Sequence, residues 1–567
     1  MFHSLFKKAV IFQQNGDESA AIKLYQQLIE EQNDLYSFIN LTALLRHNGH
    51  TDKAHKLCLH ALHHHPEIHN LWALLAKIEL DIDKPALSLR SVLKAILLKP
   101  AKYEYRLLLI QILNIQSYFY LALQTLRPLC SSPVSCQSNF RLRLTIIYAE
   151  ILSGIYRKYG DNSLNNVRSS LLEELMNSTL DLDDVDRFRA LCYVIQLHLD
   201  QKDYTRAFTS YERLKSILSK PTNLTVSDLK EVIQSYHNVG WNLGISLIKR
   251  GDFLNGWKLY EHGLQVPAPS IQRWQRALKK AYTSEEVPIW LGESLQGKHL
   301  LILAEQAIGD TMMFLQLICL ISPPPGNITL YLPQRLVPIY LRTFPQFTVV
   351  SHEDLDSLSK YCYDFQIPCG SLPKLLLSQP SIPLHNVPSL AIDKRKYIDF
   401  RSKYLQGSRH LIGISWRGGA VQKRVKLKSS SLEFFLPILK CKQYQFVSLQ
   451  YGDVAAEVNQ FNSKYGTDII VDTTVNPLKD MDTWLSQVSA MDAIVSIANT
   501  TVHGAGALKL KTCVLVSDSS DWRWLDHDII NECIWYPSVT IFHQNGTGKW
   551  SIDNIKKWLL STIHSTN

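Results

Sequence analysis

The chain has 567 residues, more than one hydrophobic core ordinarily accommodates, so we expect several domains. A hydrophobic fraction of 46% and a charged fraction of 20% are typical of folded proteins and exclude a largely disordered chain. No apolar run is long enough to cross a bilayer, and the segment from Met1 to Lys8 lacks the apolar region of a signal peptide. We therefore expect a cytoplasmic protein.

The first part of the chain repeats itself with a period of 33 to 34 residues. Asn15-Gly16-Asp17 and Asn48-Gly49-His50 begin two equivalent units, and Pro66 and Pro100 close successive units. Apolar residues between these turns follow helical spacing. The pattern returns at Gln201-Lys202-Asp203 and at Arg250-Gly251-Asp252. We predict a tetratricopeptide-like (TPR-like) α-solenoid over residues 1–270, which either binds a protein or peptide or is purely structural or dimerising.

Metal and disulfide chemistry find little support in the sequence. None of the ten cysteines forms a C-x-x-C pair, and most lie in apolar segments, as free core thiols do. The run from His60 to His65 suggests a metal site, but it ends a repeat helix and a solvated helix face is favoured. We expect no metal site and no cofactor.

After about residue 285, short strand-like runs alternate with helical ones, which predicts two α/β lobes with parallel sheets. The first lobe, residues 285–405, has strand candidates at 300–304, 328–332, 347–350 and 363–367. The second, residues 406–567, has candidates at 410–416, 445–449, 468–472, 493–497 and 512–516. Ligands in such sheets bind at the carboxyl ends of the strands.

The first strand of the first lobe runs into a turn that contains Gly309 and Asp310. The aspartate can cap the helix that follows, and capping alone would explain it. The functional alternative is a general base that accepts the proton of a sugar hydroxyl. Asp310 is therefore the candidate catalytic residue.

In the second lobe, Trp416 and Arg417 end the first strand, and Lys428 precedes what looks like a helix N-terminus. Arg417, Lys423, Arg424, Lys426 and Lys428 form a confined basic cluster, which is either a solvated loop or a pocket for a compact anion such as a diphosphate. Gln450 ends the next strand and can read the edge of a base or ribose. Asp480, Asp482 and Trp484 open a later helix, where capping and packing are at least as well supported as ligand binding.

A small turn, Asn499-Thr500-Thr501, leads from an apolar strand into a helix of small residues that contains His503 and Gly506. Such a strand–turn–helix presents backbone N–H groups to a phosphate. The candidate donor-binding residues are Trp416, Arg417, Lys428, Gln450, Asn499, Thr500, Thr501, His503 and Gly506.

The motifs of the second half resemble those of bacterial glycosyltransferases with N-terminal TPR repeats and a family 9, heptosyltransferase-like module. The matching segments are Pro288–Gly292, Leu301–Phe314, Asp364–Pro368, Gly413–Gly418, Ser448–Asp453, Asn499–His503, Gly506–Leu508 and Asp521–Trp524. The resemblance implies a GT-B fold of two Rossmann-like lobes and inverting, metal-independent transfer from a nucleotide-diphosphate sugar. It places the base on Asp310, the basic residue on Lys428, and the donor-holding turn on Thr500, Thr501, His503 and Gly506.

The sequence departs from the family pattern at three positions, where Ala307, Gly504 and Lys509 replace the usual Gly, Leu and Gly. Gly504 either loosens the start of the helix or lets the donor come closer. The resulting hypothesis is a glycosyltransferase whose solenoid recruits a protein or glycan acceptor, with no nucleic acid and no transmembrane segment. The alternative is a non-catalytic TPR scaffold with a degenerate transferase module.

Overall fold

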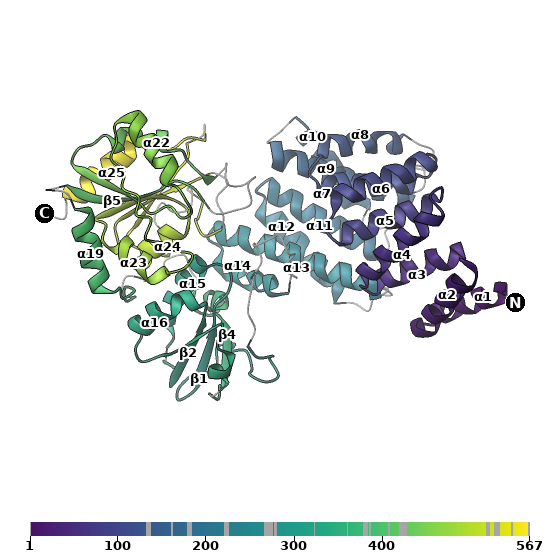
Figure 1. The fold of residues 1–567 in the computed structure, drawn as a ribbon, viewed down its shortest axis with the longest axis horizontal. Helices are drawn as coiled ribbons and strands as arrows, with labels where there is room; N and C mark the ends of the chain where they lie inside the picture. The colour runs from purple at the N-terminus through teal and green to yellow at the C-terminus, as the bar shows by residue number, and fades with distance from the viewer. Residues whose placement is uncertain are drawn as a thin grey trace. The chain divides into compact units, whose positions relative to one another are not determined.

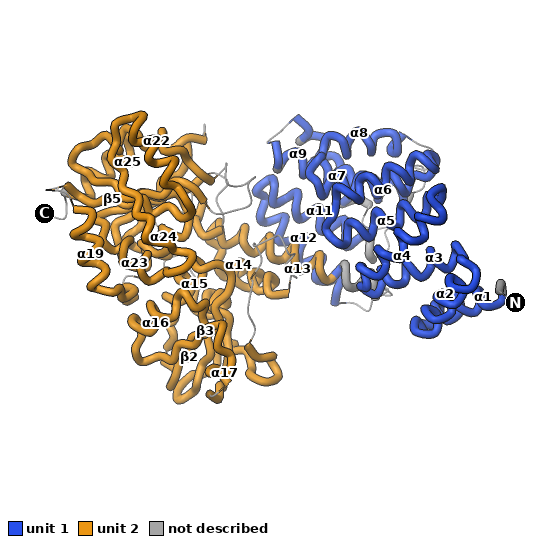
Figure 2. The backbone as a smooth tube through the Cα atoms, in the orientation of Figure 1, with its two compact units in different colours: residues 1–232 blue, residues 233–567 orange. Residues whose placement is uncertain are grey.

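A computed structural model describes residues 2–131, 138–159, 163–178, 184–219, 226–265, 276, 281–322, 324–359, 361–377, 384, 387–405, 407, 409–418, 428–517, 522–526, 533–545 and 548–564. The chain divides into two compact units, residues 1–232 and 233–567 (Figure 2).

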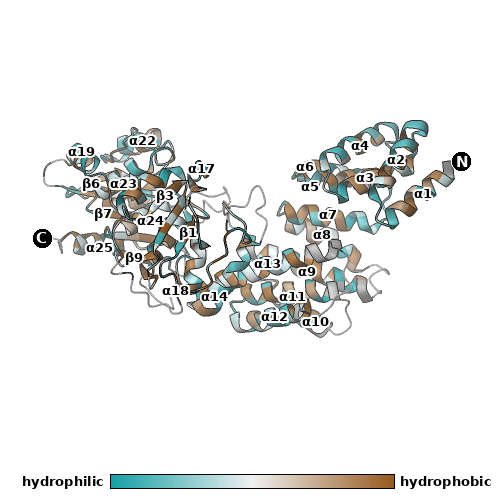
Figure 3. Cartoon of the chain, turned by 90° about the horizontal axis from the view of Figure 1, so that it is seen from below, coloured by the Kyte–Doolittle hydropathy of each residue, from teal (hydrophilic) through white to brown (hydrophobic). Residues whose placement is uncertain are grey.

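Helical hairpins build the first unit. Its helices are α1 (Phe2–Gln14), α2 (Glu18–Gln32), α3 (Leu35–His47), α4 (Thr51–His64), α5 (His69–Asp81), α6 (Pro85–Leu98), α7 (Tyr103–Ile115), α8 (Phe119–Cys130), α9 (Ser138–Tyr159), α10 (Asn165–Ser178), α11 (Asp184–Asp200) and α12 (Tyr204–Leu218). Helix α13 (Val226–Lys249) crosses the boundary between the units, and α14 (Phe253–Tyr260) follows it. Figure 3 shows hydrophilic and hydrophobic residues side by side on α2–α6, as hairpins with one buried face require.

Six of the hairpin turns share one backbone conformation. Each places one residue in the left-handed region: Gly16, Gly49, Asp83, Ser117, Lys202 and Gly251. The following N–H bonds back into the preceding helix, as in Asp17 to Phe12, Lys84 to Glu79 and Tyr118 to Leu113. This bond pattern closes a helix by satisfying carbonyls of its last turn. The period is thus fixed by turn geometry, even where the sequence carries no glycine.

A small residue follows each of these turns at the same distance along the chain. The six positions are Ala21, Ala54, Ser88, Ala122, Ala207 and Gly256, and all are buried. Small side chains there let the two helices of a hairpin approach closely.

Two parallel sheets organise the second unit (Figure 1). The first contains β1 (His299–Leu303), β2 (Asn327–Leu332), β3 (Thr348–Ser351) and β4 (Phe365–Pro368), in the order β3-β2-β1-β4. The second contains β5 (His410–Ser415), β6 (Tyr444–Ser448), β7 (Ala493–Ile497), β8 (Thr512–Val516) and β9 (Val539–His543), in the order β6-β5-β7-β8-β9. The strand order reverses at β1/β4 and at β5/β7, the positions where ligands bind in open α/β sheets.

The helices of this unit are α15 (Ile308–Leu315), α16 (Val337–Thr343), α17 (Leu355–Leu358), α18 (Leu372–Leu376), α19 (Lys394–Tyr404), α21 (Leu432–Leu439), α22 (Ala455–Tyr465), α23 (Met481–Ser489), α24 (Thr500–Ala507) and α25 (Ile552–His564). Residues 468–472, predicted as a strand, contribute only a bridge from Ile470 to Val447. Strand β9 was not predicted.

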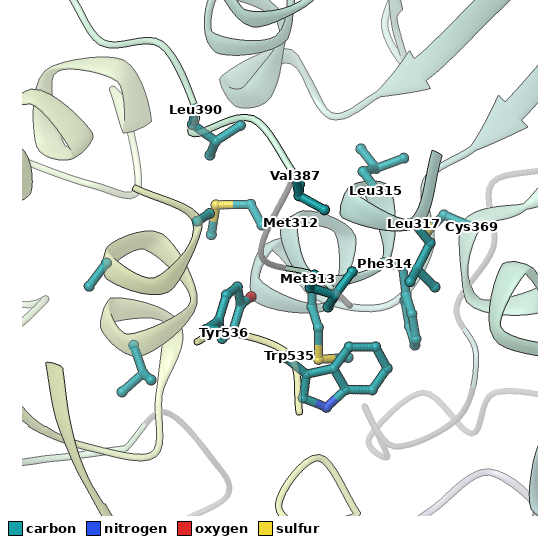
Figure 4. Packing of buried hydrophobic residues seen from close by; sticks show 14 of the residues in the cluster. Met312, Met313, Phe314, Leu315, Leu317, Cys369, Val387, Leu390, Trp535 and Tyr536 are labelled. Carbon is teal, nitrogen blue, oxygen red and sulfur yellow. The ribbon is translucent and has the colours of Figure 1, made fainter. Parts of the chain in front are cut away.

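One hydrophobic core joins the two lobes. It includes Met312 and Phe314 of α15, Leu390 of the inter-lobe segment, and Trp535 and Tyr536 of the second lobe. Figure 4 shows these side chains packed around α15. Both lobes therefore contribute side chains to one hydrophobic core.

The predicted fold class is confirmed: TPR-like helical hairpins precede two Rossmann-like lobes. The left-handed turn residue and the buried small residue recur at Gly251 and Gly256, close to the predicted end of the solenoid at residue 270. The compact units nevertheless divide at residue 232, so α14 packs with the second unit. Within the described ranges, no helix combines the length and apolarity needed to cross a membrane.

Replacing Ala54 by Leu should lower the free energy of unfolding of the first unit by about 1–3 kcal/mol, because Ala54 is fully buried in a close helix contact and a larger side chain would overfill it. Chemical denaturation followed by circular dichroism measures this loss. Leu59 on the same helix is 46% exposed, and Leu59→Ala should change stability by less than about 0.5 kcal/mol. Equal losses in both variants would contradict the assignment of Ala54 to a packing contact.

Candidate active site

Asn499 ties together the two strands at the reversal point of the second sheet. It caps α24, since its side-chain oxygen accepts a hydrogen bond from the Thr501 N–H at 2.9 Å. Its amide nitrogen donates to Ser415 Oγ at 2.7 Å and to the Arg417 carbonyl at 3.3 Å, both at the end of β5. One side chain therefore holds the N-terminus of α24 against the end of the neighbouring strand.

Gln450 fastens the same strand end from the other side. Its side-chain oxygen accepts hydrogen bonds from the Trp416 N–H at 3.0 Å and the Arg417 N–H at 2.8 Å, and its amide nitrogen donates to the Arg417 carbonyl at 3.1 Å. The amide is 8% exposed and is occupied by the chain's own backbone. Its assignment as a donor-binding residue stays a prediction, and direct recognition of a nucleotide would require it to exchange these partners.

Trp416 and Arg417 share a carboxylate on α22. The buried indole of Trp416 donates to Glu457 at 3.2 Å, and the Arg417 guanidinium forms an ion pair with the other oxygen of Glu457 at 2.8 Å. The Arg417 side chain is 39% exposed, so it can meet a ligand while it keeps this partner. Trp416 is fully buried and supports the strand end from within the core.

Lys428 lies next to this strand end. The neighbouring Ser429 Oγ accepts a hydrogen bond from the Gly418 N–H at 3.2 Å, and the Ser430 N–H donates to the Trp416 carbonyl at 2.8 Å. The helix that follows, α21, begins after Ser431. Lys423, Arg424 and Lys426 of the predicted basic cluster lie outside the described residues.

The first turn of α24 packs against the first lobe. His503 is 6% exposed, its Nδ1 lies 3.1 Å from the Tyr536 hydroxyl, and its ring stacks on Trp524. A Cβ atom at Gly309 would lie 2.7 Å from His503 Cδ2. Only glycine therefore fits at residue 309, and α15 and α24 meet at this point.

Asp310, the candidate base, is next to this contact and is 3% exposed. Its Oδ2 accepts a hydrogen bond from the Ala307 N–H at 3.2 Å, which is the capping role that the sequence offered as an alternative. Its Oδ1 accepts a hydrogen bond from Nε of Arg523 in the second lobe. A carboxylate has about four acceptor positions, so capping and pairing do not fill it.

The sequence did not predict a buried ionic network beside Asp310. Arg276 donates to both oxygens of Glu305 at 2.8–3.0 Å, and also to Glu261 and to Ser371 at 2.7 Å. The Arg276 and Glu305 side chains are fully buried. Burial raises the pKa of Tyr260 next to this network, and the charge of Glu305 acts in the same direction, so its hydroxyl remains protonated. The sequence could not predict these partners, because they come from four separate segments: α14, a linker and two strand ends.

Other small or acidic residues have packing roles. A Cβ at Gly506 would lie 2.4 Å from the Tyr536 ring, and one at Gly504 would lie 3.0 Å from Trp484. Gly504 thus accommodates the indole of α23. Asp480 caps α23 through the Thr483 N–H, and Asp482 forms a two-bond ion pair with Arg342. The structural interpretation of Asp480, Asp482 and Trp484 is confirmed. Among the described residues, no group of three His, Cys, Asp or Glu side chains is placed to hold a metal ion.

Replacing Gly309 by Ala should lower the free energy of unfolding by about 1–3 kcal/mol, because the new methyl group overlaps the His503 ring. Thermal unfolding of the full chain measures the effect. In the control variant Gly418→Ala, the added methyl group finds its nearest neighbour 3.7 Å away, at Ile497 Cδ1, and should be tolerated. A stable Gly309→Ala variant would show that the two lobes do not meet at this residue.

No protein-family model matches the sequence. Protein FlbA of Caulobacter vibrioides is 26% identical over 320 residues, which are 54% of this chain and 51% of FlbA, so the match spans about half of that relative. The glycosyl transferase family 9 structure from Veillonella parvula is 10% identical and covers 48% of this chain and 99% of its own, with a TM-score of 0.38. E. coli ADP-heptose lps heptosyltransferase II is 14% identical and covers 47% of this chain and 99% of its own, with a TM-score of 0.34. A tetratricopeptide repeat protein from Parabacteroides merdae is 12% identical and covers 44% of this chain and 91% of its own, with a TM-score of 0.35. The chain is thus similar to TPR proteins and to family 9 glycosyltransferases.

Proposed function

We propose that this protein is an inverting glycosyltransferase that moves a sugar from a nucleotide-diphosphate sugar to a protein or glycan acceptor without a metal ion. Asp310 is the general base that accepts the proton of the acceptor hydroxyl. The carboxyl ends of β5, β6 and β7 in the second lobe bind the donor.

One observation carries this proposal. Helix α24 begins at the reversal point of the second sheet, and its first turn lies against the start of α15 in the first lobe. The N-terminus that Asn499 caps and the carboxylate of Asp310 therefore belong to one junction. A donor anchored at the first and an acceptor hydroxyl beside the second would be held close together, which is what group transfer requires.

The charge at the donor end fits a diphosphate leaving group. The N-terminus of α24 carries a partial positive charge, and Arg417 and Lys428 lie at the facing strand end. Fixed positive charge of this kind stabilises a departing nucleoside diphosphate. This supports a metal-independent mechanism, in which activity would survive chelation of divalent cations.

The TPR-like repeats are the proposed acceptor-recruiting part of the chain. Stacked helical hairpins offer extended surfaces for polypeptide partners. A protein acceptor or a glycan carried by a protein would both suit such a surface.

A second candidate function is a non-catalytic interaction protein. Two predicted site residues already have partners within the chain, which favours this alternative: Asp310 pairs with Arg523, and Gln450 bonds to the backbone of Arg417. The two candidates differ in what happens when Asp310 is changed.

Asp310→Asn should lower kcat for sugar transfer by about 100- to 10,000-fold, because an amide cannot accept the acceptor proton. Donor affinity should persist, since Asp310 lies in the opposite lobe. Transfer assays and isothermal titration with the donor measure the two effects. The matched control is Asp356→Asn, at an exposed aspartate of the same lobe, which should leave both values unchanged. Full turnover of Asp310→Asn would reject the base assignment, whereas donor binding without turnover in the wild-type protein would favour the scaffold.

Asn499→Ala should weaken donor binding and lower the free energy of unfolding by about 1–2 kcal/mol, because α24 loses its cap and its bonds to β5. Titration calorimetry and chemical denaturation give the two values. Asn462 on α22 supplies the control, since its amide also bonds to nearby backbone, at Ile469. Asn462→Ala should cost stability but preserve donor affinity. Equal donor affinity in the wild-type protein and Asn499→Ala would remove the α24 N-terminus from the donor site.

A further inference from the structure

The segment Trp522-Arg523-Trp524 reaches from the second lobe to the candidate base in the first. Nε of Arg523 donates to Asp310 Oδ1, and its Nη2 donates to Gln306 Oε1 at 3.3 Å. The Arg523 side chain is 16% exposed. A guanidinium that is charged at any working pH thus lies against a nearly buried carboxylate.

Aromatic packing fixes the guanidinium in place. It lies 4.6 Å above the ring of Trp522, which stacks on Phe314 of α15 with ring centroids 5.9 Å apart. The backbone carbonyl of Arg523 accepts a hydrogen bond from the Trp535 indole at 3.0 Å. On the other side, Trp524 stacks on His503. Both neighbours of Arg523 in the chain are therefore anchored at the junction of the lobes.

Gln306 completes the arrangement from the first lobe. Its backbone is in the left-handed region, with φ of 59°, which is uncommon for a residue other than glycine and costs free energy. Its side chain bonds both to Arg523 and to the buried hydroxyl of Tyr260 on α14. Backbone strain next to a buried ion pair is typical of a site whose geometry is held for function.

Other titratable and charged groups also surround Asp310. They come from α14, the linker, the ends of β1 and β4, α24 and the second lobe, and are Tyr260, Arg276, Glu305, Cys369, His503, Arg523 and Tyr536. Burial raises the pKa of Tyr536 and of Cys369, so neither is charged at neutral pH. Arg276 is engaged by Glu305 and Glu261, which leaves Arg523 as the cation in direct contact with Asp310 within the described ranges.

We propose that the catalytic base is assembled from both lobes, with Arg523 as the positioning residue that keeps Asp310 oriented toward the acceptor hydroxyl when the lobes are closed. This inference rests on the proposed function. It explains why the carboxylate and its cation come from opposite lobes. When the lobes are apart, Asp310 lacks the residue that orients it.

The step balances with Arg523 acting only through Asp310. The acceptor O–H bond breaks and its proton passes to the carboxylate, while the acceptor oxygen bonds to the anomeric carbon of the sugar. The bond from that carbon to the phosphate oxygen breaks, and its electron pair leaves with the nucleoside diphosphate. Arg523 forms no bond to either substrate.

Arg523→Gln should lower kcat by about 100-fold, because the carboxylate is no longer held in the transferring geometry, while the KM of the donor changes little. Arg523→Lys keeps the charge but not the planar guanidinium, and should recover only part of the rate. Transfer assays that give kcat and KM separately compare both variants with the wild-type protein.

Arg342→Gln is the matched control. Arg342 also joins the lobes, through bonds of 2.7 and 3.1 Å to Asp482, but it does not contact Asp310. Its loss should destabilise lobe closure without the loss of kcat by about 100-fold. An unchanged kcat in Arg523→Gln, or an equal loss of kcat in Arg342→Gln, would overturn the proposal and leave the proposed function standing.

A double-mutant cycle provides a readout that does not depend on turnover. The melting temperatures of Asp310→Asn, Arg523→Gln and the double variant should be non-additive, with the double variant closer to the wild-type protein than the sum of the single losses. Additive losses would show that the pair is not formed in solution. Coupling without turnover of any nucleotide sugar in the wild-type protein would reject the proposed function, and with it a base for Arg523 to position.

Discussion

The contact between α15 and α24 is the constraint on which the second unit depends. Gly309 has no side chain, so the His503 ring can lie against the backbone of the first lobe. The close approach brings the nearly buried Asp310 within reach of Arg523, whose side chain is 16% exposed. Loss of one partner of a largely buried ion pair is strongly destabilising, so the two lobes are held in register by the same groups that the proposed chemistry requires.

Two further sets of contacts surround this contact. Trp257 and Tyr260 of α14 pack against Trp522, and Arg276 fastens Glu261 at the end of α14 to Glu305 at the end of β1. The last helical hairpin of the repeat pattern is therefore part of the two-lobed unit.

The repeat shows how far local sequence predicts a fold. Gly16, Gly49 and Gly251 mark left-handed turns that the sequence reveals, because glycine adopts that conformation readily. Asp83, Ser117 and Lys202 occupy the same conformation without a glycine. The turn at Lys202 was still recognised from its neighbours Gln201 and Asp203, whereas the turns at Asp83 and Ser117 were not predicted.

The candidate site divides in the same way. Asn499, Thr501 and the end of β5 were predictable because strand, turn and helix follow one another in the chain. The partner of Asp310 was not, because Arg523 is 213 residues away and only the closure of the lobes joins them. Gln450 and Trp416 were correctly placed at the strand end, but their side chains bond to backbone and to Glu457, which a sequence pattern does not reveal.

The most direct test of a donor-binding junction is a thermal-shift titration of the full chain with a panel of nucleoside diphosphates and their sugar conjugates. A ligand that binds only the folded state at 100 times its Kd stabilises that state by about 2.7 kcal/mol. The account predicts that at least one nucleoside diphosphate raises the melting temperature saturably. A melting temperature that no member of the panel changes would contradict it.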